Sequence, residues 1–182
     1  MKEHLIKARA IYRGKSVGFS VDRVRLPDGK TATREYLNHP GAVAVVAYAS
    51  PSRILLVRQY RYPVKSITWE IPAGKISPGE SPLACVNREL EEETGFKARR
   101  VRRMLSYWPT AAFSDEIIHI FWAWDLTRGT FNPDEDEFIT SQTVDLKTAL
   151  SWVRSGKIKD SKTVIALLAV ASGTFPKQPF RS

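Results

Sequence analysis

Glutamates crowd one short segment of this 182-residue chain, residues 74–96, which reads GKISPGESPLACVNRELEEETGF. If the part after Pro82 is an α-helix with about 100° per residue, Glu93 and Glu92 lie at about 40° and −60° from Glu89. These three carboxylates would share an arc of about 100°, where they repel one another unless a cation binds among them. Such a site suits a hard dication that prefers oxygen ligands, namely Mg²⁺, or Mn²⁺ as a substitute for it. A zinc site would instead require clustered His or Cys residues.

Local signals place these glutamates on a helix. Ser81 is a good N-cap, Pro82 suits the first helical position, and Gly95 suits the position after the last turn. A metal ion held on that helix would polarise a phosphoryl oxygen and lower the pKa of an attacking water. The alternative is an ordinary acidic helix face that points into solvent.

Short apolar runs of strand length surround the helix and predict one buried sheet. They cover residues 42–49, 54–57, 67–71, 101–107, 117–124 and 138–144. Asp145 is a candidate N-cap for a second helix over residues 146–154. A third helix over 161–171 has an apolar side formed by Val164, Ile165, Leu167 and Leu168. This order predicts an α/β (α+β) fold, an α/β/α sandwich with a mixed central sheet.

The first 38 residues form a separate section in this prediction. A turn signal, Pro27-Asp28-Gly29-Lys30, lies between two β-like runs, residues 16–26 and 31–37, and predicts a hairpin. We therefore divide the chain into an N-terminal β section, residues 1–38, and a main domain, residues 39–182.

Composition narrows the class of protein. The chain has a single cysteine and no apolar run of about 18 residues, which favours a cytoplasmic protein without a membrane span. Its net charge of +9 attracts anions such as nucleotides. The densest basic cluster, residues 97–103, is either a solvated strand edge or a contact for phosphate or RNA.

The segment 74–96 resembles the signature of the Nudix hydrolase family, whose fixed positions are all filled. They are Gly74, Glu80, Arg88, Glu89, Leu90, Glu92, Glu93, Gly95 and Phe96. A chance match is on the order of 10⁻⁹ per window. The resemblance implies a Nudix-type fold in which Glu89, Glu93 and the main-chain carbonyl of Ala73 bind the metal. It also implies that Glu92 is a further ligand or the general base, and that Glu80 and Arg88 orient the ligands.

Further segments are similar to the ADP-ribose pyrophosphatase branch of that family. They are residues 33–35, 39–43, 57–63, 69–74 and 113–116, and the resemblance covers about residues 30–170. It implies hydrolysis of ADP-ribose to AMP and ribose 5-phosphate. It also implies a homodimer in which the N-terminal strands of each subunit reach across to the partner.

The branch also implies roles for six other residues. Arg34 and Arg58 would bind the diphosphate or position the substrate, or they form surface salt bridges. Glu35 and Glu70 would contact the ribose or adenine, or they are surface charges. Glu135 or Glu137 would act as general base, or the acidic run 134–137 is a solvated turn.

One departure and two other functions stay open. Ala111-Ala112 stands where the branch usually has Pro-Gly, so another nucleoside diphosphate sugar is also a candidate substrate. An RNA 5′-end hydrolase, acting on a cap or a triphosphate, is favoured by the basic cluster, although nucleic acid is the less expected partner. A non-enzymatic nucleotide-binding module is a further alternative, against which the complete set of glutamates argues.

Overall fold

The computed structural model describes residues 1–133 and 137–173, and these form two compact units. The first unit contains Met1–Gly41 and Tyr107–Ile117. The second contains Ala42–Ser106 and the described residues from Ile118 onward.

The first unit is built on a four-stranded antiparallel sheet. Its strands are β1 (His4–Lys7), β2 (Ala10–Arg13), β3 (Gly18–Arg25) and β4 (Thr31–Asn38). β3 pairs with β4 over its whole length, from Gly18 opposite Asn38 to Arg25 opposite Thr31. The intervening turn is closed by the Leu26 N–H, which donates to the Lys30 carbonyl at 2.8 Å. The predicted N-terminal hairpin is therefore confirmed.

A loop in the same unit contains the departure at Ala111 and Ala112. The Thr110 carbonyl accepts hydrogen bonds from the amides of Phe113 at 3.2 Å and Ser114 at 3.1 Å. The Phe113 carbonyl in turn accepts from the Leu37 amide at 2.9 Å, which fastens the loop to β4. Two alanines thus form this turn with ordinary negative φ angles, without the Pro-Gly pair.

The second unit contains a seven-stranded mixed sheet. Its strands are β5 (Ala42–Ser50), β6 (Arg53–Arg61), β7 (Ser66–Glu70), β8 (Ala73–Lys75), β9 (Phe96–Tyr107), β10 (Ile118–Arg128) and β11 (Thr140–Asp145). The main order is β11-β6-β5-β10-β9, while β7 pairs with β6 and β8 with β5. β10 runs parallel to β5, and β6 and β8 run antiparallel to it. β5 reads as a continuous apolar run because both faces of this central strand are covered.

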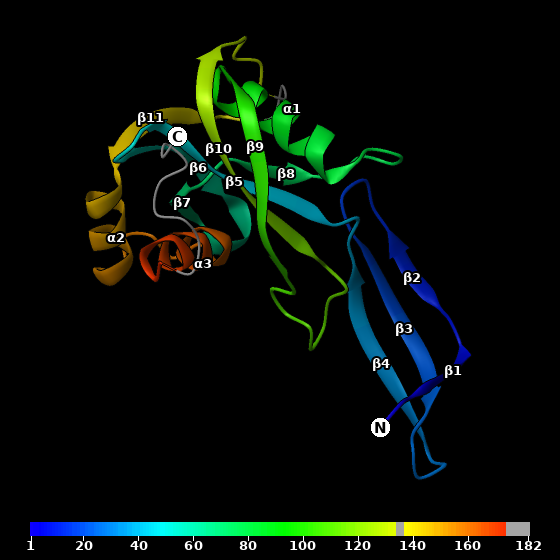
Figure 1. The fold of residues 1–182 in the computed structure, drawn as a ribbon. Coiled ribbons are helices and arrows are strands. Elements are labelled where there is room, and N and C mark those ends of the chain that lie inside the picture. The colour runs from blue at the N-terminus through cyan, green and yellow to red at the C-terminus, as the bar shows by residue number, and fades with distance from the viewer. Residues whose placement is uncertain (134–136, 174–182) are drawn as a thin grey trace. The chain divides into compact units, whose positions relative to one another are not determined.

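Helices cover both faces of that sheet (Figure 1). α1 (Pro82–Thr94) lies on one side, and α2 (Leu146–Arg154) and α3 (Ser161–Ala171) lie on the other. A short 3₁₀ helix, η1 (Tyr62–Val64), joins β6 to β7. The predicted α/β/α sandwich with a mixed sheet is confirmed. No helix among the described residues is both long and apolar enough to cross a membrane.

Several details differ from the sequence prediction; for example, β6 runs over Arg53–Arg61 rather than over residues 54–57. β9 begins at Phe96 rather than at residue 101, because the chain passes directly from the helix end at Gly95 into the strand. β11 begins at Thr140 rather than at 138. The predicted apolar side of α3 is wrong in part, since Leu168 is 50% exposed while Lys162 and Thr163 are buried.

Candidate active site

Local capping fixes α1 where the sequence predicts it. The Ser81 Oγ accepts a hydrogen bond from the Ala84 amide at 3.2 Å, and Pro82 occupies the first turn. Gly95 ends the helix with a φ of 71°, a left-handed conformation that glycine adopts without strain. One side of the helix packs into the core through Cys85, Val86, Leu90 and the neighbouring strand residues. The glutamates line the border of that side.

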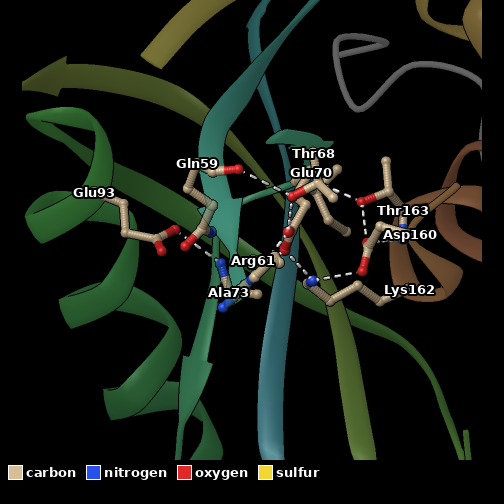
Figure 2. Close-up of polar contacts among 10 residues, drawn as sticks. Gln59, Arg61, Thr68, Glu70, Ala73, Glu93, Asp160, Lys162 and Thr163 are labelled. Carbon is tan, nitrogen blue, oxygen red and sulfur yellow. Dashed lines mark hydrogen bonds and ion pairs between the residues drawn. The ribbon is translucent and has the colours of Figure 1, made fainter. Parts of the chain in front are cut away.

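Glu93 is the most buried of them, at 2% exposure. Its Oε2 accepts a hydrogen bond from the Ala73 amide at 2.9 Å, which joins α1 to the start of β8 (Figure 2). Burial, together with the Glu89 and Glu137 charges, raises the pKa of Glu93 to about 8, although the hydrogen bond from the Ala73 amide lowers it. A buried carboxylate of this kind favours a nearby positive charge.

Glu89 lies directly against Gly74 of β8. A Cβ on Gly74 would stand 1.9 Å from the Glu89 carboxyl carbon, so only glycine leaves room for this side chain. Burial raises the pKa of Glu89 to about 7 although the neighbouring Arg88 lowers it. Two partly desolvated carboxyl groups therefore lie beside the backbone of residues 73–74.

Arg88 holds three carboxylates at once. Its Nε and Nη2 donate to Glu80 at 2.9 and 3.0 Å, a two-pronged pair. Its Nη1 lies 2.7 Å from Glu89 Oε1 and 2.8 Å from Glu92 Oε2. The Arg88 hydrogen bond keeps the pKa of Glu80 at about 2. This geometry agrees with the orienting role expected of Glu80 and Arg88.

Glu89 and Glu93 both lie beside residues 73–74, and the Glu89 charge raises the pKa of Glu93, whereas Glu92 is paired with Arg88. Among residues 1–133 and 137–173, no three His, Cys, Asp or Glu side chains are placed so that they could hold a metal ion. Arg88 lies between Glu89 and Glu92 instead, because it is the nearest cation to these like charges. The donors nevertheless fit a hard dication in kind: they are carboxylate and carbonyl oxygens, and the absence of a side chain at Gly74 lets the Glu89 carboxylate lie against the backbone of β8.

Glu135 lies outside the described residues. Glu137 is exposed, and its charge raises the pKa of both Glu89 and Glu93. Since such an influence falls off with distance, Glu137 belongs to the electrostatic surroundings of these two side chains.

Arg34 and Glu35 lie on β4 of the first unit, and both are exposed. Arg34 Nε donates to Glu3 at 2.9 Å, which is the surface salt bridge considered as its alternative role. Glu35 stands opposite Val21 of β3. Their roles toward a substrate stay predictions.

Arg58 and Glu70 lie in the second unit, on the neighbouring strands β6 and β7. Arg58 is exposed, with its guanidinium carbon 5.9 Å from the centre of the Trp69 ring. Glu70 is 1% exposed, so the alternative that it is a surface charge is wrong. Arg61, Thr68 and Lys162 all donate to its carboxylate (Figure 2), so a direct substrate contact would break one of these bonds.

Sequence reasoning missed this cluster around Glu70. It contains Arg61, Asp160, Lys162 and Thr163, of which Lys162 and Thr163 are buried. The available signal was a lysine one residue after the helix start in an otherwise apolar helix. A lysine at such a position is buried only where a carboxylate pairs with it.

Comparisons with known proteins give consistent results. The family model described as "NUDIX domain" matches residues 38–168. The chain is 42% identical to a methanol dehydrogenase activator of Bacillus methanolicus, over 91% of each chain. It is 40% identical to an ADP-ribose pyrophosphatase of Bacillus subtilis, over 92% of this chain and 91% of the other. A solved ADP compounds hydrolase superposes with a TM-score of 0.82 at 21% identity, over 94% of each chain, and so has the same fold.

Proposed function

Because the chain belongs to the Nudix hydrolase family, we propose that it is a magnesium-dependent pyrophosphatase of nucleoside diphosphate sugars. ADP-ribose is the proposed substrate, with AMP and ribose 5-phosphate as products. The observation that carries this proposal is the Arg88 cluster with Glu80, Glu89 and Glu92, in a chain 40% identical to an ADP-ribose pyrophosphatase.

Members of this family generally use a divalent metal, and the choice of Mg²⁺ is part of the proposal. Glu89, Glu93 and the Ala73 carbonyl would hold it, with Glu92 as a further ligand. The donor oxygens support Mg²⁺ or Mn²⁺ over softer metals. When bound, the ion would polarise a phosphoryl oxygen and acidify a water.

The reaction adds a water oxygen to one phosphorus of the diphosphate and breaks the bond from that phosphorus to the bridging oxygen. The bridging oxygen leaves with the other phosphate. Glu92 or Glu137 would accept the proton of the attacking water. Arg58 would bind phosphate oxygens through its planar guanidinium group, and the same role for Arg34 stays a prediction from the resemblance.

The names of the relatives support the substrate class more firmly than one individual substrate. A third relative, from Streptomyces rubellomurinus, is named a hydrolase of a CMP phosphonate conjugate. It is 34% identical over 89% of this chain and 79% of its own length. Both named hydrolases act on a nucleoside phosphate joined to a second group. We therefore treat cleavage at that junction as the proposed chemistry, and ADP-ribose as its first candidate.

A substrate panel with product identification tests the proposal. The protein would be incubated in Mg²⁺ with ADP-ribose, nucleotide sugars, diadenosine polyphosphates, 8-oxo nucleotides and capped RNA. We expect the highest kcat/KM for ADP-ribose, with AMP and ribose 5-phosphate as the products. Preferred cleavage of capped RNA would replace the proposal, and no turnover of any nucleotide would favour a binding module.

RNA 5′-end hydrolysis is kept as a second candidate because of β9. Arg99, Arg100 and Arg102 are exposed on this strand at the end of the sheet order. No ion pair within the described residues involves these three arginines. The Arg102 guanidinium carbon lies 5.9 Å from the centre of the Trp124 ring, and no carboxylate in the described part of the chain competes with a phosphate group for its charge. The alternative is that charge on an edge strand prevents pairing with other chains.

The proposal includes a homodimer and a cytoplasmic location. Exposed apolar side chains of the first unit, among them Leu5 at 62%, Ile11 at 47% and Tyr12 at 61%, support association through this sheet. Cys85 is the only cysteine, so no disulfide can form within the chain, and this supports the reducing cytoplasm as the proposed location. Light scattering at micromolar concentration tests the dimer.

A further inference from the structure

A buried ionic cluster links the first turn of α3 to the segment that leads into the candidate active site (Figure 2). Lys162 is 9% exposed; its Nζ donates to the Glu70 carboxylate and lies 2.8 Å from Asp160 Oδ1. Glu70 is itself 1% exposed. Buried charges of this kind depend on one another, since removing one leaves the other desolvated and less well paired.

A second link runs beside the first. The Ile71 amide donates to Thr163 Oγ1 at 2.9 Å, and that hydroxyl donates to Asp160 Oδ2 at 2.6 Å. Two successive residues, Glu70 through its side chain and Ile71 through its backbone, are thus fastened to the same turn of α3.

The segment that follows is fastened on its other side. The Pro72 carbonyl accepts from the Val45 amide at 2.9 Å, and the Ala73 amide donates to Glu93 Oε2 at 2.9 Å. Residues 70–73 therefore form a short bridge between α3 and α1, with a defined contact at each residue. Only about 10 Å of extended chain separates Glu70 from Ala73, so a shift of Glu70 would also shift Ala73.

From these contacts we propose that Lys162 is a positioning residue for the metal site. Together with Asp160 and Thr163, it fixes the bridge, and thereby the Ala73 carbonyl and the Glu93 carboxylate that would hold the ion. Lys162 itself touches neither substrate nor metal. The inference rests on the proposed metal-dependent hydrolysis, and it adds α3 to the elements that set the site's geometry. Ligand groups must be held within about 0.5 Å of their productive positions, which is why such support matters.

Metal binding without substrate is the direct test. We would titrate Mn²⁺ into the substrate-free full chain and measure free Mn²⁺ by electron paramagnetic resonance. Lys162→Met should lower the Mn²⁺ affinity by about tenfold or more, the usual effect of losing a group that supports a ligand. The Mg²⁺ concentration for half-maximal turnover should rise by a similar factor. Lys159→Met removes the same charge from an exposed neighbour and should leave both values unchanged.

Thr163→Val provides a second variant that keeps the shape of the side chain but removes its hydroxyl. It should lower Mn²⁺ affinity in the same direction. A folded Lys162→Met protein with wild-type Mn²⁺ affinity would overturn the inference, and if that variant does not fold, wild-type affinity in Thr163→Val would do so. Glu93→Gln separates the two proposals: wild-type Mn²⁺ affinity in that variant would refute the metal site, and this inference with it.

Discussion

Gly74 and Glu89 are in direct contact across β8 and α1. An added Cβ at Gly74 would stand 2.0 Å from one carboxylate oxygen of Glu89 and 2.3 Å from the other. The two residues stand 15 positions apart in the sequence, and the packing of α1 on β8 brings them together. The requirement for glycine at residue 74 is therefore a requirement of the Glu89 carboxylate, since the φ angle there is not positive.

Substitution Gly74→Ala should abolish most activity while leaving the protein folded. The atoms in the way belong to the end of a flexible side chain, so Glu89 would move aside at small cost in stability. We expect kcat/KM to fall by at least about 100-fold, with a thermal midpoint close to that of the wild type. In a Glu89→Gln background the same substitution should add little, because the group it displaces has already lost its charge. Additive losses in the two variants would contradict this reading.

Substitution Glu93→Gln should lower turnover by at least about 100-fold and also change how stability depends on pH. Burial raises the pKa of Glu93 to about 8, above the ordinary 4.5. Between these values the folded state holds a proton that the unfolded state releases, so metal-free stability falls as the pH rises from 4.5 through 8. Between pH 6 and pH 9 this loss of stability is on the order of 3 kcal/mol. Thermal unfolding in EDTA at pH 6 and pH 9 should show this loss in the wild type and a much smaller one in the variant.

Local sequence signals were sufficient for the elements that carry the site. Ser81, Pro82 and Gly95 fixed α1 because capping involves only neighbouring residues. The family resemblance implied that Glu80 and Arg88 orient the ligand glutamates, and their ion pair agrees with that role. A periodic pattern bounded by such signals leaves little freedom to the chain.

Contacts between distant elements could not be read from the pattern. Lys162 and Glu70 are separated by 92 positions, and only the packing of α3 against the sheet brings them together. The position of Arg88 between Glu89 and Glu92 was also unforeseen, because a helical wheel gives directions but not which charges pair. The start of β9 was missed because residues 97–100 include none of the β-branched or aromatic residues that are enriched in strands.

Substitution Glu70→Gln should destabilise the protein at neutral pH and weaken its acid dependence. Burial would raise the pKa of Glu70, but the Arg61 hydrogen bond and the Lys162 charge outweigh it and hold the pKa at about 2. Stability from this group is therefore fully present above pH 4.5 and is lost as the pH falls from 4.5 toward 2. We expect a loss of about 3 kcal/mol at pH 7 and a smaller one at pH 3, measured by urea unfolding. An equal loss at both pH values would contradict the assignment.

Substitution Ile11→Asp should convert the proposed dimer into a monomer. Ile11 lies on β2 and is 47% exposed, and a carboxylate there could not be buried against a second apolar sheet. Light scattering would give the mass of wild type and variant at micromolar concentration. Lys7→Asp on the adjacent β1 introduces the same group at a charged position and should leave the dimer intact. A monomeric wild type would remove the dimer proposal.

The arginines of β9 decide between a small substrate and RNA. A nucleotide with two phosphates releases few counterions, so its KM should change by less than about tenfold between roughly 50 and 200 mM salt. An RNA contact through six or more phosphates would instead lose on the order of 1,000-fold in affinity over that range. Replacing Arg99, Arg100 and Arg102 by alanine should accordingly leave ADP-ribose turnover unchanged. These exposed residues lie on β9, at the opposite end of the sheet order from β6 and β11. If the triple variant lost RNA cleavage and the wild type showed the steep salt dependence, the basic strand would be a substrate channel rather than a protected edge.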